Sequence, residues 1–357
     1  MDKVRYAIVG AGWIAQEAFM PAVDQTGNSV MTAIITGNAD AAEKLKDFYG
    51  IPQSWGYDDY DAALASGAFD AVYIALPNSM HADFAIRALK AGIHAIVEKP
   101  LAISVAECEA MIAASEESGA HLMTAYRLHC EPATVEAIKL VREGAIGSPR
   151  YFSSCFSFIS DAGNHRLEAK HWGGPLQDIG VYCLNAARHV IGAEPIEAVA
   201  MQTHGSDPRF AEVEATIAAL LRFPGGEIAH FTVSFDAEAT NSYRIIGTDG
   251  EIEMEQAYEF QTTPRIVLRK DGKEQVMEFN NVDHFGAQTA YFSDCILSGQ
   301  KPMPDGAEGL ADVRALLAIE AASKTGQAQR IEGPPMKASP DPSMVRNVPR
   351  TDRRLVL

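Results

Sequence analysis

Short apolar runs alternate with helical segments over the first 124 residues, and this alternation limits the fold more than any other feature. The runs are not interrupted by a polar residue at every second position, as a strand with one solvent face would be. Strands of this kind are buried on both faces, which is typical of a parallel sheet covered by helices. We therefore expect a doubly wound parallel α/β domain over residues 1–124. The predicted strands are Val4–Val9, Val30–Ile35, Ala71–Leu76, His94–Val97 and Leu122–Thr124.

Helical segments separate these runs and carry recognisable end signals. Ser104-Val105-Ala106-Glu107 has the serine–glutamate spacing of a capping box, and Gly92 is a typical helix stop. The predicted helices are Ile14–Gln25, Ala39–Phe48, His81–Ala91 and Ser104–Ser118.

The pattern changes after Ala125. Apolar and polar side chains then alternate, as in Val213-Glu214-Ala215-Thr216-Ile217, which indicates a strand with one buried face. Turn signals such as Pro224-Gly225-Gly226 separate further strands. We expect an α+β domain over residues 125–332, built on a large, mainly antiparallel open sheet, followed by an extended, proline-rich basic tail over residues 333–357.

Length and charge limit the classes of partner. A chain of 357 residues is long for one hydrophobic core, which agrees with two domains. The 30 lysines and arginines against 47 aspartates and glutamates give a net charge of −17, which opposes nonspecific binding to nucleic acid or anionic lipid. The 5 cysteines form no Cys-x-x-Cys pair, so we expect neither a disulfide framework nor a metal site. No leader or membrane-spanning run is recognisable, which predicts a cytoplasmic protein with no membrane partner.

The first predicted strand ends in Gly10-Ala11-Gly12-Trp13-Ile14-Ala15, which fits the pattern Gly-x-Gly-x-x-Gly/Ala. Gly10 would permit the tight turn, and Gly12 would permit the close approach of a pyrophosphate. Trp13 and Ile14 lie at the helix N-terminus, whose unpaired N–H groups attract a phosphate. Because the motif follows a strand and opens a helix, it predicts dinucleotide binding.

The tip of the second strand indicates which dinucleotide is bound. An acidic residue there would bind the ribose 2′-hydroxyl of NAD. The sequence instead has Ile35-Thr36-Gly37-Asn38, with no carboxylate to repel a 2′-phosphate. Thr36 and Asn38 can donate hydrogen bonds to that phosphate, so NADP is favoured and NAD remains possible.

Leu76-Pro77-Asn78 follows the third strand, at the sheet edge where ligands of such folds bind. Pro77 and Asn78 are candidates to line the nicotinamide ribose. A proline turn with Asn78 as a helix cap explains the same residues and is compatible with that role. His81 belongs to the same candidate site, although packing in the first helical turn suits it better than catalysis.

Glu98-Lys99-Pro100 ends the fourth predicted strand. Lysine is rarely buried at such a place without a partner. Pro100 disfavours helical geometry at Lys99, so the lysine is directed off the strand tip. A helix-capping surface lysine is the alternative, but the preceding glycine loop favours a place for Glu98 and Lys99 in the cofactor site.

Together with Asp178-Ile179-Gly180-Val181-Tyr182, these motifs resemble those of the glucose–fructose oxidoreductase/inositol dehydrogenase (Gfo/Idh/MocA) family in order and spacing. Ala125-Tyr126-Arg127-Leu128-His129 and Glu308-Gly309-Leu310-Ala311-Asp312-Val313-Arg314 are similar to its glucose–fructose oxidoreductase branch. The resemblance covers nearly the whole chain up to the tail. It implies a Rossmann domain and a second domain whose open sheet mediates oligomerisation, so a homodimer or homotetramer is expected.

The resemblance also implies the catalytic residues. Lys99 matches the lysine that contacts the reacting hydroxyl and the nicotinamide, and Asp178 and Tyr182 match the pair that faces it. Residues 178 and 182 are at positions i and i+4, so a helix places them on one face. Oxidation of an alcohol requires a proton acceptor, and tyrosine and lysine can both serve. We interpret Tyr182 as the proton donor and acceptor, Lys99 as an electrostatic anchor and possible relay, and Asp178 as the residue that orients the substrate.

Three further residues are assigned with less independent support from the sequence. The resemblance places Tyr126 in the substrate site and Arg127 in the cofactor site, whereas interdomain packing explains both equally well. His165 is a candidate substrate contact, although close relatives have tryptophan there.

The expected activity is that of an NADP-dependent oxidoreductase acting on an aldose or related cyclic polyol, with a pyranose oxidised at C1 to a lactone. A trans-dihydrodiol dehydrogenase is the alternative enzyme. A non-catalytic nucleotide sensor on the same fold is the alternative from another class.

Overall fold

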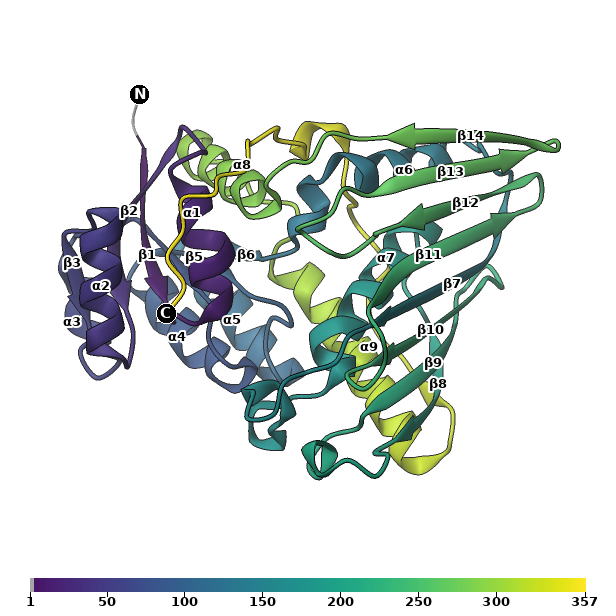
Figure 1. The fold of residues 1–357 in the computed structure, drawn as a ribbon, viewed down its shortest axis with the longest axis horizontal. Helices are drawn as coiled ribbons and strands as arrows, with labels where there is room; N and C mark the ends of the chain where they lie inside the picture. The colour runs from purple at the N-terminus through teal and green to yellow at the C-terminus, as the bar shows by residue number, and fades with distance from the viewer. Residues whose placement is uncertain (1–2) are drawn as a thin grey trace. The chain divides into compact units, whose positions relative to one another are not determined.

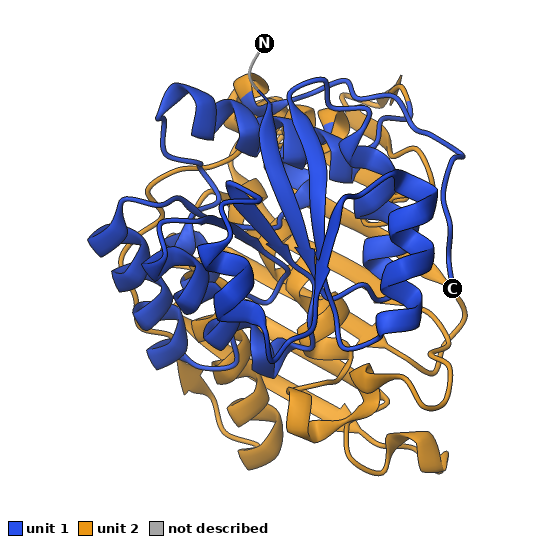
Figure 2. Cartoon of the chain, turned by 90° about the vertical axis from the view of Figure 1, so that its left-hand side faces the viewer, with its two compact units in different colours: residues 1–131, 281–310, 344–357 blue, residues 132–280, 311–343 orange. Residues whose placement is uncertain are grey.

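The computed structural model describes residues 3–357, so the first two residues of the predicted amino-terminal domain lie outside the described range. The chain forms two compact units, shown in blue and orange in Figure 2. Unit 1 comprises residues 1–131, 281–310 and 344–357, and unit 2 comprises residues 132–280 and 311–343. Two segments that the sequence placed beyond the first domain, 281–310 and 344–357, thus pack with it.

Unit 1 contains a six-stranded parallel sheet with the order β3-β2-β1-β4-β5-β6 (Figure 1). This confirms the doubly wound parallel sheet. β3 was not predicted, because its three residues are too few and too exposed to give an apolar run. The strands are β1 (Val4–Val9), β2 (Ser29–Ile35), β3 (Gln53–Trp55), β4 (Ala71–Ile74), β5 (His94–Val97) and β6 (Leu122–Thr124).

The parallel strands end at the same level. Val9 pairs with both Ile35 and Ile74, and Ile74 pairs with Val97. The strand order reverses beside β1, because β2 lies on one side of it and β4 on the other. Such a reversal leaves a crevice at the carboxyl ends of the strands, which is where this type of sheet binds ligands.

The helices predicted to begin at Ala39, His81 and Ser104 are present, whereas the helix Tyr60–Ala65 was not predicted. Ser104 Oγ accepts from the Glu107 N–H at 3.2 Å, and the Glu107 carboxylate accepts from the Ile103 N–H at 3.1 Å, so the capping-box residues do cap this helix. The helices are α1 (Met20–Val23), α2 (Ala39–Tyr49), α3 (Tyr60–Ala65), α4 (His81–Lys90), α5 (Val105–Ser118) and α8 (His284–Ser298), with short turns η1 (Ala15–Phe19), η2 (Asn78–Met80) and η3 (Arg127–Cys130).

The helix predicted over Ile14–Gln25 differs from an ordinary α-helix. Its first part, η1, is a π-helical turn in which the Met20 N–H donates to Ala15 O, five residues earlier. Pro21 follows and has no N–H to continue the regular pattern. The wider turn agrees with the known placement of π-turns at irregularities in helices and at functional sites.

Unit 2 contains a nine-stranded sheet with the order β14-β13-β12-β11-β7-β10-β9-β8-β15. All pairs are antiparallel except β7 with β10, which confirms the large, mainly antiparallel sheet. The strands are β7 (Pro149–Ser157), β8 (Glu197–Thr203), β9 (Thr216–Arg222), β10 (Ile228–Ser234), β11 (Thr240–Gly247), β12 (Gly250–Glu255), β13 (Arg265–Lys270), β14 (Lys273–Glu278) and β15 (Gln329–Arg330).

One face of this sheet is covered by helices and the other is open. α6 (Pro132–Arg142) and α7 (Val181–Ile191) pack on the covered face, and α9 (Gly306–Thr325) follows later in the chain (Figure 1). In β9 the side chains of Ile217 and Leu221 are buried whereas Leu220 is 46% exposed, so the predicted alternation is present.

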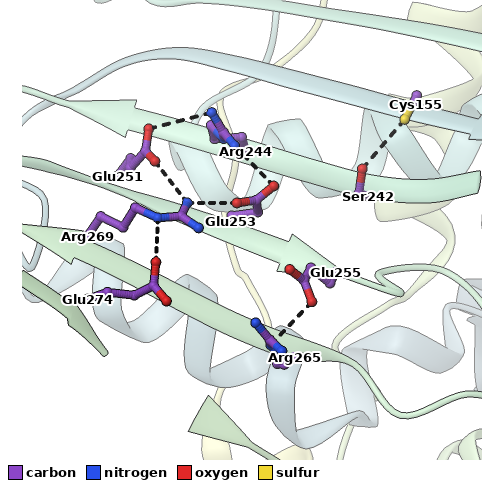
Figure 3. A network of polar contacts seen from close by, with 9 residues as sticks. All are labelled: Cys155, Ser242, Arg244, Glu251, Glu253, Glu255, Arg265, Arg269 and Glu274. Carbon is purple, nitrogen blue, oxygen red and sulfur yellow. Dashed lines mark hydrogen bonds and ion pairs between the residues drawn. The ribbon is translucent and has the colours of Figure 1, made fainter. Parts of the chain in front are cut away.

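The open face carries a ladder of ion pairs across β11, β12, β13 and β14 (Figure 3). The Arg269 guanidinium contacts Glu253 at 2.7 Å, Glu251 at 3.0 Å and Glu274 at 2.9 Å. Arg244 adds a pair with Glu253 at 3.1 Å. Exposed pairs of this kind contribute about 0.2–1 kcal/mol each, so they favour one strand register more than they stabilise the sheet.

Residues 333–357 contain one short turn, η8 (Pro342–Met344), and are otherwise irregular. Among the described residues, no helix is both long enough and apolar enough to cross a bilayer.

A fully buried ion pair joins α7 to α9 in unit 2. Arg188 donates to Asp312 at 2.6 Å, and both side chains are completely buried. Asn185 also donates to Asp312, at 2.9 Å. Arg188 also donates to the Glu194 carboxylate at 2.6 Å and 2.7 Å, so two carboxylates hold one buried guanidinium. Removing the Asp312 carboxylate takes away part of that compensation in a buried setting, which is much more costly than losing an exposed pair.

We predict that Asp312→Ala lowers the free energy of unfolding by about 3–5 kcal/mol, because Arg188 would stay buried with one carboxylate fewer. Denaturant titration of both proteins measures this difference. Glu332→Ala is the matched control, since its pair with Arg330 is more than four-fifths exposed, and it should change stability by less than about 0.5 kcal/mol. Equal losses in the two variants would contradict the prediction.

Candidate active site

The glycine loop lies at the carboxyl end of β1, pressed against the end of β4. Gly10 has φ +92°, and a Cβ there would lie 2.4 Å from Ala75 O, so only glycine fits. Gly12 is different, because a Cβ at this position would meet no atom within 4 Å. The loop therefore combines a tight contact behind it with open space at Gly12, which suits a pyrophosphate group.

Behind this loop, Gln16 connects the helix to the loop backbone. The Gln16 N–H donates to Gly12 O at 3.1 Å, and the Gln16 side-chain amide donates to Ala11 O at 2.6 Å. Trp13, in the first turn, is 51% exposed. These contacts order the start of the helix, where unpaired N–H groups and the helix dipole favour an anion.

Thr36 and Asn38, the residues expected to bind a 2′-phosphate, lie at the tip of β2, and Tyr57 lies beside them. Asn38 Oδ1 caps α2 by accepting from the Ala41 N–H at 3.0 Å, and the Asn38 N–H donates to the Thr36 hydroxyl at 3.4 Å. Because Oδ1 is used in the helix cap, Nδ2 is the atom of the Asn38 side chain that can donate to a ligand. Sequence reasoning missed Tyr57, whose ring lies against Gly37. Burial raises the pKa of the Tyr57 phenol, and its proximity to Thr36 and Gly37 acts in the opposite direction.

His81 links two loops of the site. Its ring nitrogens lie 2.8 Å from Leu76 O and 2.9 Å from Pro100 O, and the side chain is fully buried. Burial lowers the pKa of His81 to about 4, so the ring is neutral at pH 7 and donates from one nitrogen. His81 thus positions the segments that begin at Pro77 and end at Pro100, and its own ring contacts the protein.

Glu98 and Lys99 follow β5 and are held by a buried polar chain. The Glu98 carboxylate accepts from the Lys99 N–H at 3.3 Å and from the Tyr73 hydroxyl, and Gln288 on α8 donates to Tyr73 at 3.2 Å. Burial raises the pKa of the Glu98 carboxyl, while the charges of Lys99 and Arg127 act in the opposite direction. The chain fixes the backbone of Lys99 at the edge of the sheet.

Arg127 lies in this buried region. Its guanidinium donates to His284 Nδ1 at 2.9 Å, and only 4% of the residue is exposed. Burial and the charge of Arg127 lower the pKa of His284, which keeps the ring a neutral acceptor. Tyr126 packs against His129 with ring centroids 5.1 Å apart. His284 and Gln288 gave no sequence signal, because they are more than 150 residues from the partners they contact.

Asp178 and Tyr182 lie at the start of α7 in unit 2. The helix opens with a second π-helical turn, η6 (Leu176–Gly180), in which the Val181 N–H donates to Leu176 O. Over residues 176–190, only Asp178, Tyr182 and Ala186 escape full burial. Their spacing of four residues places the acid and the phenol on one accessible stripe.

Arg166 is the residue that sequence reasoning missed beside Asp178. Its Nε lies 3.2 Å from the Asp178 carboxylate, and both side chains are partly accessible. The pKa of the adjacent His165 is lowered, because burial and the charge of Arg166 outweigh the opposite effect of Asp178. The Tyr182 ring meets Phe156 at a centroid distance of 5.9 Å in an edge-on contact. Lys99 belongs to unit 1, whereas these residues belong to unit 2.

A segment of each unit matches a known protein-family model. Residues 4–126 match the family model of an oxidoreductase family with an NAD-binding Rossmann fold, and residues 134–253 match a GFO/IDH/MocA C-terminal domain. An NADP-linked D-xylose 1-dehydrogenase of Haloarcula marismortui is 31% identical, over 93% of this chain and 94% of that protein.

Two solved structures are also similar. The aldose-aldose oxidoreductase of Caulobacter crescentus, complexed with glycerol, is 36% identical with a TM-score of 0.87, over 92% of this chain and 99% of that chain. A 3-ketoreductase of Actinomadura kijaniata, in complex with NADP and TDP-benzene, is 27% identical with a TM-score of 0.82, over 90% of this chain and 98% of that chain. With both halves matched by family models, the chain belongs to the Gfo/Idh/MocA family of oxidoreductases.

Proposed function

We propose that this protein is an NADP-dependent oxidoreductase that transfers hydride between the nicotinamide and an aldose or related cyclic polyol, with a pyranose oxidised at C1 to the 1,5-lactone. The single observation that carries the proposal is the accessible Asp178–Tyr182 stripe in unit 2, found in a chain whose unit 1 carries a glycine loop followed by Lys99. The xylose and aldose activities of the similar proteins support this substrate class.

The residues of unit 1 fit a dinucleotide. The open space at Gly12 and the helix N-terminus behind it would hold the pyrophosphate. Thr36 and Asn38 would hold a 2′-phosphate, where an NAD-specific site needs a carboxylate. Pro77 and Asn78 would line the nicotinamide ribose. The bound nicotinamide supplies a hydride acceptor at its C4, and the protein must supply the rest.

The remaining chemistry is proton transfer and orientation. The substrate C1–H electron pair leaves as hydride, while the proton of the C1 hydroxyl passes to Tyr182. Lys99 anchors the reacting oxygen by its positive charge. Asp178 orients a hydroxyl of the sugar, and Arg166, 3.2 Å away, fixes the direction of that carboxylate.

We also propose a cytoplasmic location. All five cysteines in the described range are free thiols, and four of them are buried, as expected in a reducing compartment.

The activity is tested by incubating the protein with NADP⁺ or NAD⁺ and a panel of aldoses, including D-xylose and D-glucose, together with trans-diols. We expect reduced nicotinamide to form with at least one aldose, and faster with NADP⁺ than with NAD⁺. Turnover of diols alone would favour the dihydrodiol dehydrogenase alternative. Tight nucleotide binding with no turnover of any substrate would favour the sensor and contradict the proposal.

Lys99→Ala and Tyr182→Phe should each lower kcat by about 10²–10⁴-fold, because each removes a group used in proton transfer or in anchoring the reacting oxygen. Nucleotide affinity, measured by NADPH fluorescence, should change little. The matched controls are Lys90→Ala and Tyr151→Phe, which alter exposed residues outside the site. A Tyr182→Phe enzyme with the wild-type rate would show that the proton moves through another group.

We further propose that the open face of the unit 2 sheet joins two copies of the chain in a homodimer. Large apolar side chains stand on this face in neighbouring strands: Val199 is 42% exposed, Leu220 46% and Met201 78%. Val199 and Leu220 are cross-strand partners, so they form one continuous patch, which β7 and β10 separate from the ion-pair ladder. Exposed apolar patches of this kind mark interaction sites.

Leu220→Glu should therefore convert the dimer to monomers, because it places a charge in the apolar patch. Light scattering after size-exclusion chromatography measures the mass of each species. Glu109→Gln, an exposed change on α5 of unit 1, is the control and should leave the mass unchanged. A monomeric wild-type protein would overturn the proposed dimer, and a dimeric Leu220→Glu variant would place its interface elsewhere.

A further inference from the structure

The last fourteen residues, 344–357, cross unit 1 as an extended strap whose first part is firmly anchored. Met344 is 1% exposed and packs with Cys130 and Ala287. Val348 is 6% exposed, and its carbonyl accepts from the Asp283 N–H at 2.9 Å. In Figure 1 this yellow segment passes α8 and α1 on its way to the point marked C.

The surface under the strap is shaped for it. A Cβ at Gly286 on α8 would lie 2.6 Å from Val348 Cγ1, so a glycine is needed where the strap crosses this helix. Arg346 then pairs with Asp294 of α8 at 2.8 Å. Apolar, backbone and ionic contacts therefore all hold this part of the strap on one path over unit 1.

Further along, the strap reaches the helices that flank the dinucleotide loop. The Arg353 guanidinium donates to Phe48 O at the end of α2 at 2.9 Å and lies over the Phe48 ring, 5.4 Å from its centroid. Arg354 pairs with Glu17 in η1 at 3.1 Å. Glu17 is adjacent to Gln16, the residue that holds the glycine loop from behind.

The end of the strap bonds to Gln16 itself. The Leu357 N–H donates to Gln16 Oε1 at 2.7 Å, while Gln16 Nε2 donates to Ala11 O at 2.6 Å. Gln16 is 4% exposed. Both ends of the amide are therefore occupied, and the contact with Leu357 fixes which end faces the loop.

This arrangement controls a peptide group of the phosphate loop. In a trans peptide the C=O and N–H point in opposite directions. Because the Ala11 carbonyl is directed toward the Gln16 side-chain amide, the Gly12 N–H is directed away from that amide. Gly12 is also the residue that faces open space. The strap thus acts, through Gln16, on an N–H group of the loop that would bind a pyrophosphate.

We propose that residues 353–357 are part of the dinucleotide site as positioning residues: they hold Gln16, and through it the Ala11–Gly12 peptide, in the orientation that binds the pyrophosphate and so slow release of the nucleotide. This inference rests on the proposed binding of NADP at the glycine loop. It does not depend on which sugar is the substrate.

The test compares the full chain with a variant lacking residues 354–357. NADPH fluorescence gives Kd, stopped-flow displacement by excess NADP⁺ gives the dissociation rate, and thermal unfolding is followed with and without NADPH. We expect Kd to rise about three- to tenfold through a faster dissociation rate, as for the loss of one or two hydrogen-bonded contacts. The melting temperature without nucleotide should stay at the wild-type value.

Point variants separate this role from a general loss of stability. Arg354→Glu should raise Kd, and combining it with Glu17→Arg should restore affinity, because the ion pair is remade with reversed charges. Arg330→Ala, which removes an exposed pair with Glu332 in unit 2, is the control.

The outcomes distinguish the two proposals. A wild-type protein that binds no NADPH overturns the proposed function and the strap with it. Tight wild-type binding that survives the deletion with unchanged Kd and dissociation rate overturns the strap alone. A deletion that lowers the melting temperature equally with and without NADPH shows a purely structural strap and also overturns the inference.

Discussion

The level ends of three neighbouring parallel strands are the constraint on which the nucleotide half of the structure depends. Val9 stands opposite Ile74, and Ile74 opposite Val97, so the loops after β1, β4 and β5 leave the sheet at one edge. The first two loops touch, and only the missing side chain of Gly10 allows this approach. A shift of one residue in either pairing would displace Lys99 relative to the glycine loop by about 3.3 Å and disturb the packing on both buried faces of the sheet.

Burial of the Glu98 carboxyl is the cost of fixing Lys99 at this edge. Loss of water raises the pKa of Glu98, and the Tyr73 hydroxyl, the Lys99 N–H and the charge of Arg127 offset part of that loss. Hydrogen bonds in such a chain strengthen one another, so removing one group weakens the bonds of its neighbours as well. The lysine backbone is thereby held by the core, while Lys99 as a whole stays partly exposed.

The features that sequence predicted are those with a local backbone cause. Gly10 was recognised because the turn requires positive φ, and the Ser104–Glu107 spacing announced its helix. The residues that were missed have partners far away in the chain. His284 meets Arg127 across 157 residues, and no periodicity or spacing near either one records this contact. The π-helical turn at Leu176–Gly180 was missed for another reason, since its apolar pattern is that of an ordinary helix.

Two arginine–aspartate pairs in unit 2 show why accessibility, more than pair geometry, separates a structural contact from a site. Asp312 and Arg188 are completely buried, so the fold depends on compensation of the Arg188 charge by Asp312 together with Glu194. Asp178 and Arg166 are 16% and 29% exposed, and a pair in that setting adds little stability. Under the proposed function, the place of Asp178 on the accessible stripe with Tyr182 would serve a ligand that needs an oriented hydrogen-bond acceptor beside a phenol.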